Sequence, residues 1–576
     1  MHQLNENREI NVMLNQVVAS INSLAEQQVL HIQRLTKIGE ALSSVTDLDM
    51  IFDMILEEAI EFTNADGATI YKVNEESRQL EFEIVYNRTM KMRQGGTHGV
   101  VNWPSIPLFD EDGKPRLSHI VTAVYHSKKC VCFDDVYETK DYDISGTIKT
   151  DQTYGYRCKS MLTLPLKNHE DEVLGIIQMI NATDPGGNVI SFNDEHRTML
   201  NSLASQAAIA LSNRRLIESL ETLLLQFMQS IAKGIERKSK YSSDHITRVA
   251  RLTDMFALKL NEAPKGVFKD LHFSDSELKE LSMAGMMHDV GKIITPEFIM
   301  DKSTKLETIL DRIDLVQERF KNMKLLFRYL RHELSEDQFA AYVADTLGTQ
   351  AAPGELESYL DAELAFIQKI NIGGEFLPDG DIERIERLSA IKFECEGEEY
   401  LLITAEEKRN LQIRKGTLMP EEIKVMSQHV FVTWEMLSEL SFPKKYSNVA
   451  FYAATHHEKL NGKGYPWGLT ADKLPIQSRI IAVADIFEAL TAADRPYKKA
   501  KTLSESLKIM AFCVKDGDLD ADLLDFFLDS GLYLDFANRF MNPDQIDSPD
   551  ISALRKIYRP VGSDSDPARA TTSSSK

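Results

Sequence analysis

The stretch Met283-Ala-Gly-Met-Met-His-Asp-Val-Gly-Lys292 places a histidine and an aspartate side by side in an apolar segment. Its composition predicts a buried helix, so His288 and Asp289 are expected to lie away from water. A buried carboxylate is costly unless a partner compensates its charge. A metal ion is an economical partner, and the rest of the chain offers further ligands of the same kind.

Five more side chains that can ligate a metal lie in helical or apolar contexts. A lone histidine on an apolar face is more often a hydrogen-bonded core residue than a ligand, so no single one decides the question. The aspartate inside the apolar run Ile480–Leu490 carries more weight, because its charge would be desolvated. Imidazoles together with carboxylates suit metals of intermediate hardness, such as Mn, Fe, Ni or Zn. The additional candidates are His245, His429, His456, His457 and Asp485.

The order of these residues resembles that of the HD phosphohydrolase superfamily, and longer motifs resemble its HD-GYP family. His456-His-Glu-Lys-Leu-Asn-Gly-Lys-Gly-Tyr-Pro466 is similar to the GYP signature of that family. The resemblance covers about residues 225 to 545. Members of the family hydrolyse cyclic dinucleotides, chiefly cyclic di-GMP, to linear pGpG or GMP. Three further similar motifs are His288-Asp-Val-Gly-Lys-Ile293, Lys415-Gly-Thr-Leu418 and Arg495-Pro-Tyr-Lys498.

The resemblance implies a site for two divalent transition metals, with Fe or Mn expected. Asp289 would bridge the two ions, and hydroxide formed from water at the metals would attack phosphorus in line with the leaving 3′-oxygen. The implied ligands of the first ion are His245, His288, Asp289 and Asp485. The implied ligands of the second ion are His429, His456 and His457.

Basic side chains and the GYP loop supply the expected contacts to substrate. An ammonium can act as a point charge on the hydroxide or on phosphate oxygens, and a guanidinium can donate two parallel hydrogen bonds. Glycine allows close backbone approach, although the loop alone is also compatible with an ordinary tight turn. The candidate contacts are Lys292, Gly464, Tyr465, Arg495 and Lys498, and the candidate catalytic residues are Asp289 and Lys292.

Two positions depart from the family pattern. Asn461 stands in the GYP loop where the family commonly has aspartate, so a hydrogen-bonding side chain is kept and a charge is lost. Tyr241 stands one helical turn before His245, where some members carry a glutamate that helps to build a third metal site. The sequence therefore favours two metals over three.

A long insertion, about residues 303–414, separates the HD pair from His429, where the family usually has one short connection. Apolar residues from Ile309 to Leu330 are spaced alternately by four and three, as in a heptad seam. A second helix is expected from Leu356 to Ile367, so the insertion is expected to be a helical hairpin. A surface elaboration or a dimer contact is the favoured interpretation, and a lid over the active site is the alternative.

The sequence before residue 240 indicates a sensor. Residues 48–213 show an α+β pattern that resembles a GAF domain, a small-ligand sensor built on an antiparallel sheet. Heptad spacing predicts a coiled-coil helix over residues 1–47 and a signalling helix over residues 214–240. The expected strands cover residues 68–73, 80–86, 160–166 and 174–180, and the expected helices cover residues 51–62 and a long stretch from Asp194.

The expected fold class is therefore multidomain. An α+β GAF domain is followed by a linking coiled-coil helix and by an all-α HD-GYP domain over residues 241–545 that carries the helical-hairpin insertion. Residues 546–576 are expected to form a C-terminal segment with a polar, disordered tail.

Composition limits the partners and the compartment. The chain has 576 residues, of which 43% are hydrophobic, and a net charge of −22, which disfavours binding to nucleic-acid polymers and anionic membranes. Its five cysteines are scattered, and no signal segment or long apolar span is apparent. These features predict a protein of the reduced cytoplasm.

Three interpretations of function remain open. The first is a cyclic-dinucleotide phosphodiesterase that an unknown small ligand of the GAF domain gates through a homodimeric helix. The second is a non-catalytic receptor that binds a cyclic dinucleotide and signals through protein partners. The third is an HD hydrolase of mononucleotides. The complete set of ligands favours the enzyme over the receptor, and the GYP loop weighs against the third.

Overall fold

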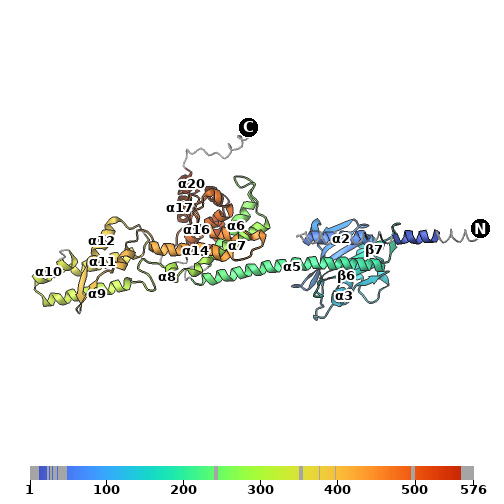
Figure 1. Ribbon diagram of the computed structural model, residues 1–576, viewed down its shortest axis with the longest axis horizontal. Coiled ribbons are helices and arrows are strands. Elements are labelled where there is room, and N and C mark those ends of the chain that lie inside the picture. The colour runs from blue at the N-terminus through green and yellow to red at the C-terminus, as the bar shows by residue number, and fades with distance from the viewer. Residues whose placement is uncertain are drawn as a thin grey trace, which may run out of the picture. The chain divides into compact units, whose positions relative to one another are not determined.

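The computed structural model of the protein describes residues 12–22, 25, 29, 36, 48–238, 244–348, 355–374, 376–395, 397–493 and 500–559. It divides into two compact units, Met1–Leu223 and Leu224–Lys576 (Figure 1). Each unit has a hydrophobic core of its own. Residues 12–22 are helical, and most of the predicted N-terminal coiled coil lies outside the described residues, as does the predicted tail from residue 560.

An antiparallel sheet forms the centre of the first unit. Within the described residues its strand order is β3-β2-β1-β7-β6-β5, with β4 paired to β2 and β8 paired to β7. The strands are β1 Ala65–Asn74, β2 Gln79–Asn87, β3 Met92–Gly95, β4 Ile106–Pro107, β5 Val131–Phe133, β6 Met161–Lys167, β7 Val173–Thr183 and β8 Val189–Ile190. The helices are α2 Leu48–Thr63, α3 Ile120–Ser127, α4 Ser145–Tyr154 and α5 Asp194–Glu236.

Alternation along the strands puts the two faces of this sheet into different cores. Ile70 packs in the core formed with α2 and the first half of α5, whereas its neighbour Tyr71 packs in the core formed with α3. All four expected strands and both expected helices are confirmed. The strands that the sequence did not predict, β3, β4, β5 and β8, have between two and four residues, too few to show a period.

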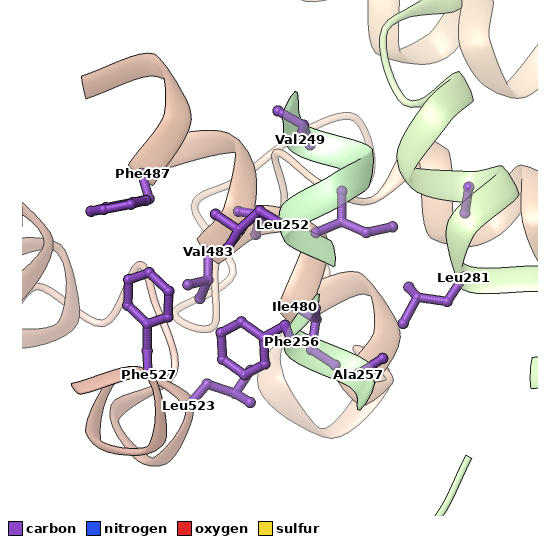
Figure 2. Close-up of a cluster of buried hydrophobic side chains, with 14 of the residues drawn as sticks. Val249, Leu252, Phe256, Ala257, Leu281, Ile480, Val483, Phe487, Leu523 and Phe527 are labelled. Carbon is purple, nitrogen blue, oxygen red and sulfur yellow. The ribbon is translucent and has the colours of Figure 1, made fainter. Parts of the chain in front are cut away.

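The second unit is largely helical. Phe256 of α6 stacks on Phe527 of α18 at 5.6 Å between ring centroids, and Phe487 of α16 meets Phe527 edge-on at 4.9 Å (Figure 2). These contacts join helices from both ends of the unit into one core. The helices are α6 His245–Asn261, α7 Asp275–Met287, α8 Glu297–Met300, α14 Pro420–Ser438, α15 Val449–Ala454, α16 Ile476–Thr491, α17 Leu503–Lys515, α18 Ala521–Asp529, α19 Leu532–Phe540 and α20 Ile551–Tyr558.

The insertion is a lobe with its own hydrophobic core, not the helical hairpin that the sequence predicted. The predicted seam residues Val316, Phe320 and Phe327 are buried, but within this lobe. Two capping boxes, begun by Ser335 and Thr404, start helices that the heptad pattern could not reveal. The elements of the lobe are α9 Ile313–Glu333, α10 Glu336–Leu347, α11 Leu356–Asn371, α12 Asp379–Ala390, α13 Ala405–Leu411, β9 Lys392–Cys395 and β10 Glu398–Leu401.

A buried ion pair ties this lobe to α14. The Lys302 ammonium donates to Glu422 at 2.8 Å and to Asn410 at 3.1 Å, and its side chain is fully buried. Glu422 also accepts the N–H of Met419 at the start of α14. Lys302, just before the insertion, therefore links Asn410 of the lobe to the first turn of the helix that carries His429 further along.

The buried Lys305 makes the stability of the lobe depend on pH. Its side chain is 1% exposed, and its Nζ donates to the carbonyl of Leu411 at 3.0 Å. Burial lowers the pKa of this ammonium from 10.5 to about 8, against the attraction of Asp381. Between these pH values the unfolded chain binds one more proton than the folded chain, so the free energy of unfolding rises with pH, by at most about 3 kcal/mol.

Thermal unfolding at pH 7 and pH 10 measures this dependence. The wild type is expected to gain stability relative to Lys305→Met as the pH rises, because the variant has no proton to lose there. Lys369→Met, which removes an exposed lysine from α11 of the same lobe, is the matched control and is expected to follow the wild type. An identical pH response in Lys305→Met and the wild type would contradict the prediction.

The described ranges contain no helix that is both long enough and apolar enough to cross a bilayer.

Candidate metal centre

The structure brings all seven predicted ligands into one buried site in the second unit. Two groups of three stand out, in each of which one ligand atom per residue lies within 4.8 Å of the others. The first cluster comprises His245, His288 and Asp289. The second cluster comprises His429, His456 and His457. Asp485 on α16 adjoins the first cluster, because its Oδ1 lies 3.4 Å from His245 Nε2 and 3.8 Å from His288 Nε2.

The backbone at the HD pair differs from the predicted continuous helix. Helix α7 ends at Met287, and a short 3₁₀ turn, η3 Val290–Ile294, follows Asp289. The turn packs directly on α14, where a Cβ at Gly291 would lie 1.9 Å from the carbonyl oxygen of His429. The Thr433 hydroxyl provides hydrogen bonds to the backbone where the helix ends: it donates to the His288 carbonyl and accepts from the N–H of Gly291. The helix thus stops where close packing against α14 requires a different backbone path.

The two carboxylate oxygens of Asp289 face different clusters. Its Oδ2 lies 3.4 Å from His245 Nε2 and 3.3 Å from His288 Nε2. Its Oδ1 lies 3.3 Å from His429 Nε2 and 4.0 Å from His456 Nε2. This is the arrangement that a bridging carboxylate needs, since each oxygen has its own set of imidazoles.

Local hydrogen bonds orient three of the imidazoles. The Nδ1 atoms of His288, His429 and His456 face the carbonyls of the residues three positions earlier, at 2.7, 2.5 and 2.6 Å. An Nδ1–H that donates to a carbonyl leaves the lone pair on Nε2. In the described part of the chain those three Nε2 atoms are buried without a hydrogen-bond partner. Buried, unpartnered lone pairs that converge on a carboxylate fit divalent metal ions.

Electrostatics sets the charge of two of the candidate ligands, Asp289 and His457. Burial would raise the pKa of Asp289, but Lys292, His288 and His245 hold it well below its usual range. Burial lowers the pKa of His457 to about 4, against the attraction of Asp485. The carboxylate is therefore ionised and His457 is neutral near pH 7, which are the forms that bind metals.

Glu488 is a member of the site that the sequence analysis missed. It lies on α16 one turn after Asp485, is 1% exposed, and accepts hydrogen bonds from His245 Nδ1 and from Arg248 Nε. The carboxylate fixes the tautomer of His245 so that Nε2 faces Asp289 and Asp485. A second acidic residue in the apolar run Ile480–Leu490 was the available signal.

Replacing this carboxylate should weaken metal binding. Glu488→Gln is expected to lower the affinity of the first cluster for Mn(II) by roughly 10- to 100-fold, because partners that orient ligating histidines contribute on that scale. Titration of the metal-free protein with Mn(II) measures the loss. Glu435→Gln, on the exposed side of α14, is the matched control, and equal affinities in the two variants would argue against an orienting role.

Glu458 organises the loop that carries Tyr465. It is 4% exposed and accepts the backbone N–H groups of Trp467, Gly468 and Leu469 at 2.7, 3.1 and 2.9 Å. The chain folds back so tightly that a Cβ at Gly464 would lie 2.3 Å from a backbone nitrogen. Close packing within the loop is therefore sufficient to explain the glycine.

Two predicted contacts have clear positions in the site. The Tyr465 ring lies 5.0 Å from the His457 ring, so it borders the second cluster. The Lys292 ammonium lies 2.5 Å from Asp289 Oδ2, which places it on the proposed bridge. Arg495, Lys498 and Tyr241 lie outside the described residues.

The structure also gives a reason for Asn461. Its Nδ2 donates to Asp518 Oδ1 at 2.9 Å and to the Asp516 carbonyl at 2.9 Å, while its Oδ1 accepts the N–H of Lys463. An aspartate could not donate these bonds and would repel Asp518. The departure from the family pattern therefore suits the local partners of the loop.

The first unit contains a cavity of about 540 Å³. Its size lies in the range of sites for small organic ligands. Tyr71 and Gln178 form a hydrogen bond on its wall, at 3.3 Å from Oη to Oε1. The wall combines aromatic surface with polar and charged side chains, and includes Phe82, Trp103, His119 and Tyr154.

Two family models match the chain. Residues 47–211 match the GAF domain, and residues 406–523 match an HD domain. The second match contains the second cluster and Asp485, whereas the first cluster lies before it. The two matches thus cover the sensor-like unit and one half of the metal centre.

Named relatives match the same region over short stretches. The cyclic di-GMP phosphodiesterase response regulator RpfG of Xanthomonas campestris pv. campestris is 41% identical over 96 residues, 16% of this chain and 25% of the relative. A cyclic di-GMP phosphodiesterase of Thermotoga maritima is 41% identical over 96 residues, 17% of this chain and 26% of the relative. The 3′3′-cGAMP-specific phosphodiesterase 1 of Vibrio cholerae serotype O1 is 47% identical over 79 residues, 14% of this chain and 18% of the relative.

The chain spans about a quarter or less of the length of these relatives. Together with the fold and the buried histidine and aspartate clusters, the matches show that this chain contains a GAF domain followed by an HD domain.

Proposed function

We propose that the protein is a sensor-regulated, metal-dependent phosphodiesterase that hydrolyses a cyclic dinucleotide, foremost cyclic di-GMP, to linear pGpG, GMP or both. The observation that carries this proposal is the carboxylate of Asp289, each oxygen of which faces its own group of imidazoles. The names of the relatives, which include cyclic di-GMP and 3′3′-cGAMP phosphodiesterases, support the substrate class.

In this proposal the ligands bind two metal ions, and other side chains contact the substrate. The first cluster with Asp485 would hold one divalent ion, the second cluster would hold another, and Asp289 would bridge them. Such ions, Fe or Mn in this proposal, supply hydroxide near neutral pH and neutralise phosphate charge. Lys292 would steady phosphate oxygens as a point charge, and Tyr465 would contact the substrate beside His457.

A turnover assay tests the proposal. The full chain, loaded with Mn(II) or Fe(II), is offered cyclic di-GMP and cyclic GMP-AMP, and linear products are separated by chromatography. Hydrolysis of either compound is the expected result. A fully loaded chain that binds a cyclic dinucleotide without cleaving it would instead support the non-catalytic receptor.

We also propose that the cavity of the GAF domain holds a small regulatory ligand with a largely apolar body. The aromatic wall supports an apolar body, and the polar and charged side chains of the wall could orient it. A ligand can alter hydrolysis only if it binds two states of the protein with different affinities. Equal hydrolysis rates with and without a ligand shown to occupy this cavity would contradict the proposal.

The partner that we propose for the middle of α5 is a second copy of this chain. Five apolar side chains there are each more than half exposed and follow a heptad spacing. Leu220→Lys is expected to shift the protein towards monomer in sedimentation experiments, whereas Gln226→Lys on the same helix is not. The exposed residues are Ile209, Leu216, Leu220, Leu223 and Phe227.

A further inference from the structure

The C-terminal end of α5 and the turn that follows it carry two charged side chains that contact the segments of the first cluster. Met228 and Ile235 of this helix are buried in the core of the second unit, so its end is fixed there. Glu236 is the last residue of the helix, and Lys238 follows two positions later. Their contacts reach α6, which begins at His245, and η3, which follows Asp289.

Glu236 caps α6 from a neighbouring helix. The residue before α6, Asp244, has a φ of +64° and makes no side-chain capping bond of its own. The Glu236 carboxylate, 8% exposed, instead accepts the N–H of Thr247, the third residue of α6, at 3.2 Å. An N-cap side chain normally accepts this bond, and the helix dipole favours a negative charge there. Glu236 thus helps to hold the turn from which His245 projects.

Lys238 holds the turn on the other side of the cluster. Its Nζ donates to the carbonyls of Lys292, Ile293 and Thr295 at 3.4, 2.5 and 2.7 Å. An ammonium has three donors and no acceptor, so one side chain can satisfy the carbonyls that end η3. This turn comes directly after His288 and Asp289, so its position constrains theirs.

We propose that Glu236 and Lys238 form a clasp that positions the first cluster, and that a displacement of the α5 end loosens this cluster before the second. The proposal rests on the proposed function, because it takes both clusters as metal sites. The second cluster lies on α14 and after α15, and the described residues show no hydrogen bond from it to Glu236 or Lys238. Since α5 also contributes Leu200 and Leu203 to a core of the GAF domain, one helix runs from the sensor's core to this clasp.

Titration of the metal-free full chain with Mn(II) alone tests the selectivity of the clasp. In Lys238→Met, one of the two ions is expected to bind about tenfold more weakly, while the other keeps its affinity. Lys238→Arg keeps the cation and should restore most of the lost affinity. Lys233→Met removes an exposed lysine from the same helix and is the matched control. Equal weakening of both ions, or the same loss in Lys233→Met, would overturn the proposal.

Hydrogen exchange of the metal-free chain gives a second readout that does not depend on activity. Glu236→Ala is expected to speed exchange at Thr247 several-fold and to leave the amides of the core helix α16 unchanged. Unchanged exchange at Thr247 would refute the capping contact. A wild type that hydrolyses no cyclic dinucleotide would end the proposed function, and the titration and exchange results would still decide whether the clasp exists.

Discussion

Asp289→Asn is expected to lower kcat for a cyclic dinucleotide by roughly 10³-fold or more, because a two-metal site depends on the ligand that bridges it. Each oxygen of Asp289 lies within 4.0 Å of two imidazole nitrogens, one pair from each cluster. An amide keeps the shape of the side chain but has one oxygen and no charge. We therefore expect the variant to bind at most one ion tightly, and steady-state kinetics with metal analysis of the same sample would measure both losses.

The matched control is Asp275→Asn, an exposed aspartate at the start of α7, the helix that ends beside His288. It should retain nearly all activity, with a loss of stability of about 0.3–1 kcal/mol from the helix terminus. Circular dichroism of Asp289→Asn should show that the fold persists. Full hydrolytic activity of Asp289→Asn in the presence of its metals would eliminate the bridging role.

The sequence could predict that the candidate metal ligands lie together, because a buried charge has few alternatives. Asp485 in an apolar helix and His288 beside Asp289 both indicated a compensating partner, and the structure brings them within 3.8 Å of each other. The partners of these ligands were harder to find. Glu488 contacts His245 across 243 positions, and such a pairing has no local pattern.

The local backbone was predicted less well than the residue types. Apolar composition suggested a helix through Lys292, yet α7 ends at Met287 because Gly291 must approach the backbone of α14. In the insertion the heptad seam correctly marked Phe320 as buried, but period alone could not show whether its partners lay in the same chain. Tertiary packing determined where α7 ends and how the insertion folds. Such contacts between distant parts of the chain leave no periodic pattern in the sequence.

Removal of the metals is expected to abolish hydrolysis, and Mn(II) or Fe(II) should restore it, whereas Mg(II) should not. Five of the seven predicted ligands are histidines, and Mg(II) prefers an octahedral set of oxygens. The Nε2 atoms of His288, His429 and His456 are buried and have no hydrogen-bond partner in the described residues. Without metal, these nitrogens therefore lack a polar partner, which is unfavourable for buried groups. Chelation, dialysis and stepwise addition of each metal, followed by the turnover assay, measure the effect.

The same samples also separate a catalytic metal from a structural one. The HD domain is expected to unfold at a lower temperature without metal, because ions that bind only the folded state stabilise it. The GAF domain has its own core and contributes none of the seven ligands, so its unfolding should not change. Activity that persists in the metal-free protein, or that Mg(II) restores as fully as Mn(II), would contradict a histidine-rich two-metal site. If Mn(II) instead raises the unfolding temperature of the HD domain and restores turnover over the same range of added metal, the ions that stabilise this fold are those that the reaction needs.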